Sequence, residues 1–332
     1  MSAFSEARAR WSARPRPAGW RIVARKELAD PLLSARFFLL VALIGLTTVG
    51  AVQAASSTIR DAAPAAAEDP SLFLRLFTVA PERLPTFFSF FGLVGLLAPL
   101  LGIAFGFDAI SSERTQGTLP RLVAQPIHRD DVINGKFVAG LAVIGTVLVS
   151  VACLVTGLGI LRLGLTPDPS EILRLVGYLI VAIVYAGAWL AFAILCSVIL
   201  RRAATAALAT IAVWLVFTLF WPLLVGLAAD TMAPAGNEAT FEQQVRNVRM
   251  EITVDRFSPQ TLYEEAATAL LSPDVRSLDV LLPEQLDRAV PGQLDLADSA
   301  LVGGAQIMVL LALTVVIFVA AYVLFLRDEI RA

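Results

Sequence analysis

The amino-acid sequence predicts an all-α polytopic membrane protein with six transmembrane helices, and three observations lead to that fold class. Hydrophobic residues make up 57% of the 332 residues and the mean hydropathy is +0.75, whereas a soluble domain has about 45–50%. They gather in uncharged blocks of about 20 residues or more, the length that crosses a bilayer as a helix. The blocks are continuous rather than alternating, which favours helices over the strands of a closed barrel.

Six blocks qualify as membrane-spanning helices. The first follows 36 residues, which is too long a leader for an ordinary secretory signal, so we expect it to remain as a span. The six predicted spans are Phe37–Ala55, Thr86–Phe107, Phe137–Leu161, Val176–Leu200, Ala203–Ala229 and Gly303–Leu326.

The segment before the first span is basic and amphipathic. Trp20 and Val23 can share one face of a helix, with Arg21 near the opposite face. Such a helix lies among the lipid headgroups rather than crossing the bilayer, and Pro31 is expected to bend it or to end its first half. We therefore predict an elbow helix within residues 1–36, which includes Arg25, Lys26 and Glu27.

Residues 230–302, between the fifth and sixth spans, are expected to form a small helical unit outside the bilayer. Between residues 241 and 252, hydrophobic side chains recur at the spacing of one helix face. Ser258 followed by Pro259 is typical of a helix start, so a second helix is predicted over Gln260–Leu271.

Lys and Arg set the predicted orientation, because cytoplasmic segments of membrane proteins are enriched in them. Sixteen of the 26 lie in residues 1–36, in residues 108–136, at the connection between the fourth and fifth spans, and after residue 326. Residues 230–300 instead hold 13 acidic residues against five Arg. We predict cytoplasmic termini in a bacterial plasma (inner) membrane.

The predicted divisions are a tail and elbow over 1–36, five spans with a cytoplasmic loop (108–136) over 37–229, an extracytoplasmic unit over 230–302, and the sixth span with its tail over 303–332.

The loop between the second and third predicted spans is charged. It reads GFDAISSERTQGTLPRLVAQPIHRDDVINGK over residues 106–136. Glu113 and Arg114 can share the wet face of a short helix, with Ile110 on the other face. Asp130 and Asp131 then open the next helix, where negative charge suits the N-terminal dipole.

A spaced pattern of 14 positions runs through this loop: Gly106-Phe107-Asp108, Ile110, Glu113-Arg114, Gly117-Thr118-Leu119, Leu122, Pro126, Arg129 and Gly135-Lys136. The pattern resembles the signature region of ABC-2 type transporter permeases. The run from Arg25 to Leu28 is similar to the start of the same permeases, above all those of nitrous-oxide-reductase maturation transporters.

In that family the loop supplies a coupling helix that docks on a separate ATPase subunit, so the resemblance implies docking by residues 110–125. Pro120 departs from the pattern, because family members tend to have a polar helix former there, and it would divide one rod into two short turns. The residues that the resemblance assigns to coupling are Asp108, Ile110, Glu113, Arg114, Gly117, Leu119, Leu122 and Arg129.

Enzyme and metal motifs are missing from the sequence. There is no G-x-x-x-x-G-K-[ST] phosphate loop, so ATP and Mg²⁺ would belong to a partner subunit. The single histidine, His128, and the two cysteines, both inside predicted spans, predict neither a metal site nor a disulfide. We expect no catalytic residue, metal ligand or cofactor in this chain.

Aromatic residues of the second and fifth spans are the predicted path-lining residues. No ionisable side chain lies well inside a predicted span, although proton and ion relays need them, so any path is expected to be apolar or weakly polar. Trp214, Phe217 and Trp221 can share a helix face, and by the family resemblance they and Phe91 line the path. The alternative is a lipid-facing aromatic belt.

These features predict the permease subunit of an ATP-driven transporter, which exports an apolar or amphiphilic substrate or acts mechanically on an extracytoplasmic partner. The expected partners are two copies of a cytoplasmic ABC ATPase, a second copy or paralogue of this chain, lipids, and a protein at residues 230–302, but no nucleic acid. A stand-alone secondary transporter or channel is an alternative that would need intramembrane charges or inverted repeats. An intramembrane lipid-modifying enzyme would need convergent acid, base or metal residues. The sequence shows neither set.

Overall fold

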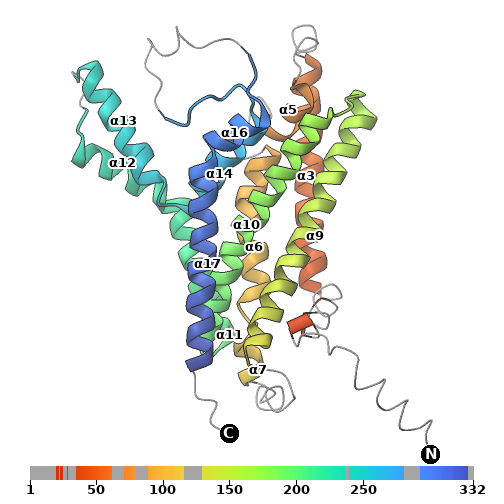
Figure 1. Cartoon of the computed structure of the whole chain (residues 1–332), viewed down its shortest axis with the longest axis vertical. Coiled ribbons are helices and arrows are strands. Elements are labelled where there is room, and N and C mark those ends of the chain that lie inside the picture. Colours follow the sequence, from red (N-terminus) through yellow and green to blue (C-terminus); the bar gives the residue numbers. More distant parts are fainter. Residues whose placement is uncertain are drawn as a thin grey trace, which may run out of the picture.

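A computed structural model of the chain describes residues 20–21, 23–24, 28, 35–61, 71–79, 89–115, 129–235, 239–279 and 292–327. Within these ranges the chain is all-helical, without strands. The long helices run side by side along the longest axis of the molecule (Figure 1). The all-helical class predicted from the continuous apolar blocks is confirmed.

Long apolar helices occupy the predicted blocks. By length and composition, five helical stretches of the described residues can cross a membrane, with α11, η2 and α12 forming one of them. The first long helix is α3, with 27 residues, but its apolar stretch within the described residues covers only Val41–Gly50, so a sixth span stays a prediction. The long elements are α3 (Ala35–Asp61), α6 (Phe90–Gly106), α9 (Arg129–Leu163), α10 (Pro169–Ile199), α11 (Ala203–Leu215), the π-helix η2 (Val216–Phe220), α12 (Trp221–Met232) and α17 (Gly304–Arg327).

Helix α10 lies at the centre of the bundle. It packs against α6, α9 and α17, and it contributes the fully buried side chains of Tyr178, Tyr185 and Leu190. The closest approach is to α6, where a Cβ added to Gly102 would lie 2.5 Å from the backbone oxygen of Ala186. Small residues allow helices to come close, and Gly102 therefore faces the central helix.

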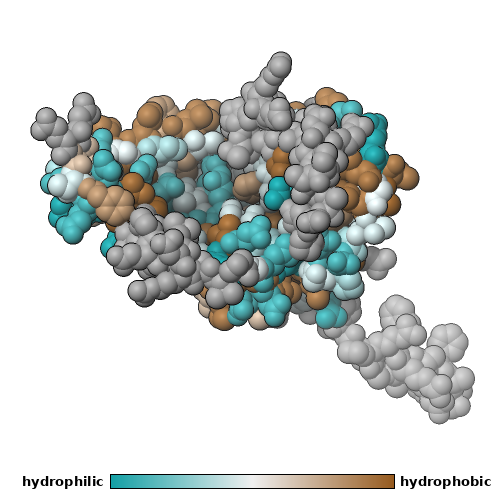
Figure 2. All heavy atoms as spheres, turned by 90° about the horizontal axis from the view of Figure 1, so that it is seen from above, coloured by the Kyte–Doolittle hydropathy of each residue, from teal (hydrophilic) through white to brown (hydrophobic). Residues whose placement is uncertain are grey.

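The shorter helices divide between the two ends of the molecule. Helix α7 (Ser111–Thr115) lies at one end, near the start of α9 and the end of α17 (Figure 1). The opposite end carries α5 (Leu72–Thr78), α13 (Phe241–Asp255), α14 (Pro259–Leu271) and α16 (Leu296–Val302). Seen onto that second end, hydrophilic side chains gather over the face and hydrophobic ones along parts of its periphery (Figure 2).

Helices α13 and α14 differ in burial. Helix α13 has no buried residue and packs against α12, and this pair leans away from the bundle (Figure 1). Helix α14 starts at the expected cap, where the Ser258 hydroxyl accepts from the Gln260 N–H at 3.2 Å. Eight of its residues are buried, and it packs on α6, α10 and α17. Helix α14 is therefore inserted into the bundle rather than resting on it.

Helix α10 extends beyond the predicted fourth span, which starts at Val176. Helix α10 begins at Pro169, after a capping box formed by Asp168 and Glu171. Arg174 is 5% exposed and donates to the carbonyl oxygens of Leu270 and Leu294 and to the Ser299 hydroxyl. Arg174 looks like a loop residue in the sequence, but here it is buried because it holds α14 and α16 against α10.

Candidate functional site

The turn from α6 into α7 is held by one serine of α10. The Ser197 hydroxyl oxygen accepts hydrogen bonds from the backbone N–H groups of Ile110 and Ser111, both at 3.0 Å. Its own proton is directed to the Ser111 hydroxyl at 3.2 Å. All three residues are 0% exposed, so these bonds satisfy amide groups that have no access to water. Helix α7 is thus fixed to the end of α10.

Two charged residues of α7 attach it to its neighbours. Arg114 donates to the Val198 carbonyl oxygen at 3.0 Å, one of the last carbonyls of α10. Glu113 pairs with Lys136 of α9 at 2.9 Å, and the two side chains are only 13% and 8% exposed. A largely buried ion pair holds its geometry better than an exposed one. Helix α7 therefore contacts both α9 and α10.

The N-terminal segment meets the first turns of α9. The backbone N–H of Trp20 donates to a carboxylate oxygen of Asp131 at 3.0 Å. A Cβ added to Gly135 would lie 2.7 Å from the Cβ of Val23 and 3.0 Å from the Trp20 carbonyl oxygen. Gly135 is therefore needed for the close approach of this segment to α9.

Part of the predicted coupling set can be placed. Asp108, Ile110, Glu113 and Arg114 lie together at the α6–α7 turn. Ile110 is 0% exposed, so its side chain packs inside the bundle rather than at a surface. Arg129 is the first residue of α9, and Asp130 and Asp131 lie in the first turn as expected. The Arg129 side chain lies outside the described residues. Gly117, Leu119, Pro120, Leu122, Arg25, Lys26 and Glu27 also lie outside them.

The aromatic residues of the fifth span form a chain of ring contacts. The rings of Phe217 and Trp221 are 5.2 Å apart, and Phe217 lies 6.4 Å from Trp189 of α10. The π-helical turn η2 between Trp214 and Trp221 changes the register that a regular helix would give. Trp214 is partly buried against the core, and Phe91 of α6 lies where its carbonyl oxygen accepts from Tyr263 at 2.9 Å.

Two cavities adjoin these rings. One, of about 180 Å³, is apolar and is lined by Trp189, Phe192 and Phe217, together with α17 residues. The other, of about 150 Å³, is lined by Phe217 and Trp221 and by the carboxylates Glu251, Asp255 and Glu264. Among the described residues, no group of His, Cys, Asp and Glu side chains could hold a metal ion.

Sequence reasoning missed Ser197 and Trp189. A serine four residues before Arg201 is an inconspicuous member of an apolar block, and nothing in its spacing shows that it binds a turn 86 residues earlier in the chain. Trp189 sits in an apolar run as any core residue would. Only the packing of α10 against α6 and η2 reveals both contacts.

Comparison with known proteins gives two matches. The sequence matches the family described as ABC-2 family transporter protein over residues 21–330. It is also 29% identical, over 214 residues, to the protein described as probable ABC transporter permease protein NosY from Stutzerimonas stutzeri. That alignment covers 62% of this chain and 68% of the relative.

Proposed function

Because the chain belongs to the ABC-2 family of transporter proteins, we propose that it acts as a permease subunit in which movement of α7 drives the transmembrane helices. A separate cytoplasmic ABC ATPase, carrying its own ATP and Mg²⁺, supplies that movement. The family and the similarity to a permease support a membrane subunit of an ABC transporter. The transport step and its coupling are the proposal.

The observation that carries the proposal is the attachment of α7 to the end of α10. Ser197 and Val198 bind α7 and lie four and three residues before Arg201, in the exposed Arg201-Arg202 connection into α11. A force applied to α7 therefore reaches the start of the fifth span through backbone-directed hydrogen bonds rather than through a flexible loop. Rigid elements of this kind can carry a displacement between sites.

A second contact supports the same movement. Glu113 ties α7 to Lys136, within two turns of the start of α9, where Asp131 also accepts from Trp20. The predicted elbow, α7 and the start of α9 thus form one connected group. We propose that the ATPase docks on residues 108–129, with Leu119 and Leu122 contributing apolar contact, and that this group moves as a unit.

The fifth span is the best candidate for a moving path helix. Only 11% of the most apolar 18-residue stretch of this span is buried, compared with 67% for that of α10. Its ring Phe217 lies beside an apolar cavity, and Phe217 and Trp221 line a second cavity that also has carboxylates of α13 and α14. We propose an apolar or amphiphilic substrate, and a second copy or paralogue of this chain against the exposed face, since large apolar patches mark interaction surfaces.

Mechanical action on a partner is the second candidate function. It is favoured by the α12–α13 pair, which stands away from the bundle at the end opposite α7 (Figure 1). Phe241 and Val248 of α13 are exposed, so this pair offers an apolar surface to a protein outside the membrane. In this variant, the partner rather than a transported molecule receives the movement.

Purification of the full-length tagged chain from its native membrane, in mild detergent, tests the proposed function. We expect a phosphate-loop ATPase in about equal molar amount, identified by mass spectrometry, and ATP hydrolysis in the eluate. Leu119→Asp combined with Leu122→Asp should lose the ATPase, because charge opposes burial at an apolar docking contact. Phe241→Asp, at the opposite end of the molecule, is the matched control and should retain it.

Recovery of the chain without a nucleotide-hydrolysing partner would contradict the proposal and reopen the channel and lipid-enzyme alternatives. If both variants recover the ATPase equally, the permease function stands but the ATPase docks elsewhere than on residues 119–122. An extracytoplasmic protein that is present with the unsubstituted chain and lost with Phe241→Asp would favour mechanical action.

A further inference from the structure

Helix α6 contains a proline that interrupts its hydrogen bonding. Pro99 lies inside α6 and has no N–H to donate to the Gly95 carbonyl oxygen, one helical turn earlier. A carbonyl left without its helical donor in an apolar bundle needs another donor. The position also divides α6 into a half that leads toward α7 and a half at the opposite end.

Tyrosines of two other helices supply hydroxyl groups at this interruption. The Tyr185 hydroxyl of α10 donates to the Gly95 carbonyl oxygen at 3.1 Å, replacing the missing helical bond. The Tyr263 hydroxyl of α14 donates to the carbonyl oxygen of Phe91, one turn earlier, at 2.9 Å. Tyr263 is then left to accept from the Tyr178 hydroxyl, which lies 2.9 Å away.

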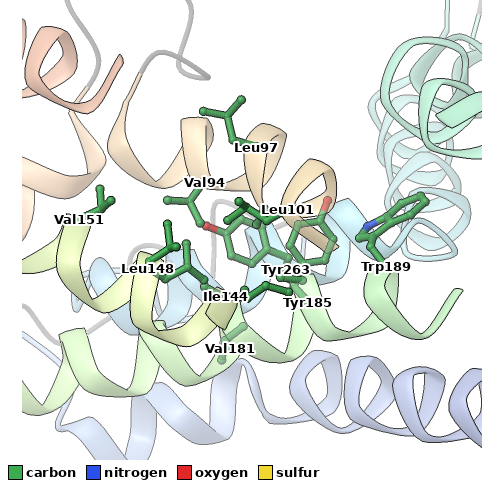
Figure 3. Close-up of a cluster of buried hydrophobic side chains, with 14 of the residues drawn as sticks. Val94, Leu97, Leu101, Ile144, Leu148, Val151, Val181, Tyr185, Trp189 and Tyr263 are labelled. Carbon is green, nitrogen blue, oxygen red and sulfur yellow. The ribbon is translucent and has the colours of Figure 1, made fainter. Parts of the chain in front are cut away.

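The two tyrosine rings are packed as one unit. Tyr185 and Tyr263 stack with centroids 4.7 Å apart and planes inclined by 15°, and both side chains are 0% exposed. Their rings lie against each other beside α6 (Figure 3). A Cβ on Gly95 would lie 3.0 Å from the Tyr263 ring, so the glycine leaves the room that Tyr263 occupies.

Both halves of α6 contact α10, but they differ in their hydrogen bonds to other elements. Toward α7, Gly102 and Gly106 touch the backbone of α10, and α7 is bonded to Ser197 of the same helix. On the other side of Pro99, the Phe91 carbonyl is held by α14 through Tyr263, and the Gly95 carbonyl by α10 through Tyr185. Helix α14 in turn belongs to residues 230–302, the segment beyond the fifth span.

We propose that Tyr185 and Tyr263 are positioning residues that transmit a change in the bend of α6 at Pro99 to α14. Because the half of α6 after Pro99 leads directly into α7, a displacement of α7 alters this bend. The Tyr263 hydroxyl then obliges α14 to follow, while the Tyr185 ring, stacked on Tyr263, bonds the Gly95 carbonyl from α10. The inference rests on the proposed function, since it needs an ATPase to displace α7. It adds the route by which that displacement reaches the opposite end of the bundle.

The test measures distances at both ends of the chain in the complete complex with its ATPase, reconstituted in lipid nanodiscs. Spin labels on Thr115→Cys and Leu326→Cys report the α7 end, and labels on Leu161→Cys and Asp274→Cys report the α14 end. All four sites are exposed, and Cys153→Ser with Cys196→Ala removes the native thiols. Each pair is compared without nucleotide and with ATP and vanadate.

With native tyrosines we expect both distances to shift on nucleotide binding. The Tyr185→Phe and Tyr263→Phe double variant should keep the shift at the α7 end and lose it at the α14 end. If the two tyrosines had only a structural role, the double variant would alter the distance shifts at both ends or at neither. A retained α14-end shift in the double variant overturns the inference, whereas no shift at either end of the unsubstituted complex overturns the proposed function and the inference with it.

Tyr178→Phe is the matched control, because it removes a hydroxyl from the same cluster but leaves both α6 carbonyls bonded. It should keep both shifts, and loss of the α14-end shift here would overturn the specific role of the two donors. Pro99→Ala restores the N–H at position 99 while both tyrosines stay in place, so it tests the hinge even if the double variant misfolds. It should also keep the shift at the α7 end and reduce the shift at the α14 end, since a continuous α6 no longer bends there. An undiminished α14-end shift would overturn the hinge.

Discussion

At the scale of single residues, two glycines decide how closely α6 approaches α10. A Cβ at Gly106 would lie 2.6 Å from the Ala193 Cβ and 2.9 Å from the Leu190 carbonyl oxygen. At Gly102 the nearest atoms, at 2.5 and 2.7 Å, are both backbone atoms. Backbone atoms cannot move away by a rotamer change, so a methyl group at either position must separate the helices.

Gly102→Ala is therefore predicted to destabilise the protein. Overpacking of a well-packed contact costs about 1–3 kcal/mol, more than the helix propensity that alanine gains. Gly226→Ala is the matched control, because nothing lies within 4 Å of a Cβ there, and it should leave the unfolding temperature unchanged or raise it. Thermal unfolding in detergent measures both; equal unfolding temperatures for the two variants would contradict the close α6–α10 contact.

Ser197 is the residue on which the position of α7 depends. Ser197→Ala would leave the buried N–H groups of Ile110 and Ser111 without their acceptor, at a cost of about 1–3 kcal/mol for each unsatisfied group. We predict faster amide hydrogen exchange in α7 and weaker stimulation of ATP hydrolysis by the permease. Ser150→Ala is the control, since Ser150 bonds only to Thr146 of its own helix at 2.7 Å. Native exchange in the Ser197 variant would disprove the attachment.

The sequence allows some of these residues to be predicted and not others. Asp108, Glu113 and Arg114 stand out as charged residues beside an apolar block, and the structure places them together at the α6–α7 turn. Ser197 and Tyr185 are each one polar group within long apolar stretches. Their partners are 86 and 90 residues away in the chain, and local periodicity carries no information about such pairs.

At the scale of elements, apolar block length predicted the helices well and their ends less well. The bounds of α17 lie within one residue of the predicted sixth span. Helix α10 begins seven residues before its apolar block, because Glu171 caps its first turn and Arg174 is buried by hydrogen bonds to α14 and α16. The π-turn of the fifth span escapes prediction because its sequence reads as a regular apolar helix.

The junction of α13 and α14 is predicted to tighten as pH falls. Burial raises the pKa of Glu264, with repulsion from Asp255 adding to it, and burial also raises the pKa of Asp255. Other charges nearby are Glu251 on α13 and Glu265, which binds Arg256 at 2.9 Å. Since the folded-state pKa values exceed the unfolded ones, stability rises as pH falls through the folded-state values and levels off below the unfolded ones.

Glu264→Gln tests this pH dependence because it removes the charge and keeps the shape. The variant should be more stable at neutral pH, by on the order of 1 kcal/mol, with a flatter response to acid. Hydrogen exchange of α14, corrected for its intrinsic pH dependence, measures both effects. Glu242→Gln on the exposed face of α13 is the control, and an identical response of the two variants would refute the role of burial.

At the scale of the whole molecule, the two ends differ in kind. One end holds α7, the first turns of α9 and the Arg201-Arg202 connection, and the other holds α5, α13, α14 and α16 (Figure 1). Among the described residues, Arg114, Lys136, Arg201 and Arg202 lie at the first end, and the carboxylates of α13 and α14 lie at the second. The distribution of Lys and Arg predicts that the α7 end is cytoplasmic, and the coupling scheme requires it, because the ATPase is cytoplasmic.

Cysteine labelling from each side of the membrane tests this orientation. In a background of Cys153→Ser and Cys196→Ala, cysteines replacing Thr115 and Arg202 should react with a membrane-impermeant maleimide only in inside-out vesicles. Cysteines replacing Gln244 and Asp274 should react only in right-side-out vesicles, because they are exposed at the opposite end. The reverse pattern would place α7 beyond the reach of any cytoplasmic ATPase. A single reversed site would instead mean that the chain crosses the bilayer differently between residues 115 and 274, so the labelling pattern decides the topology of that region and the coupling side together.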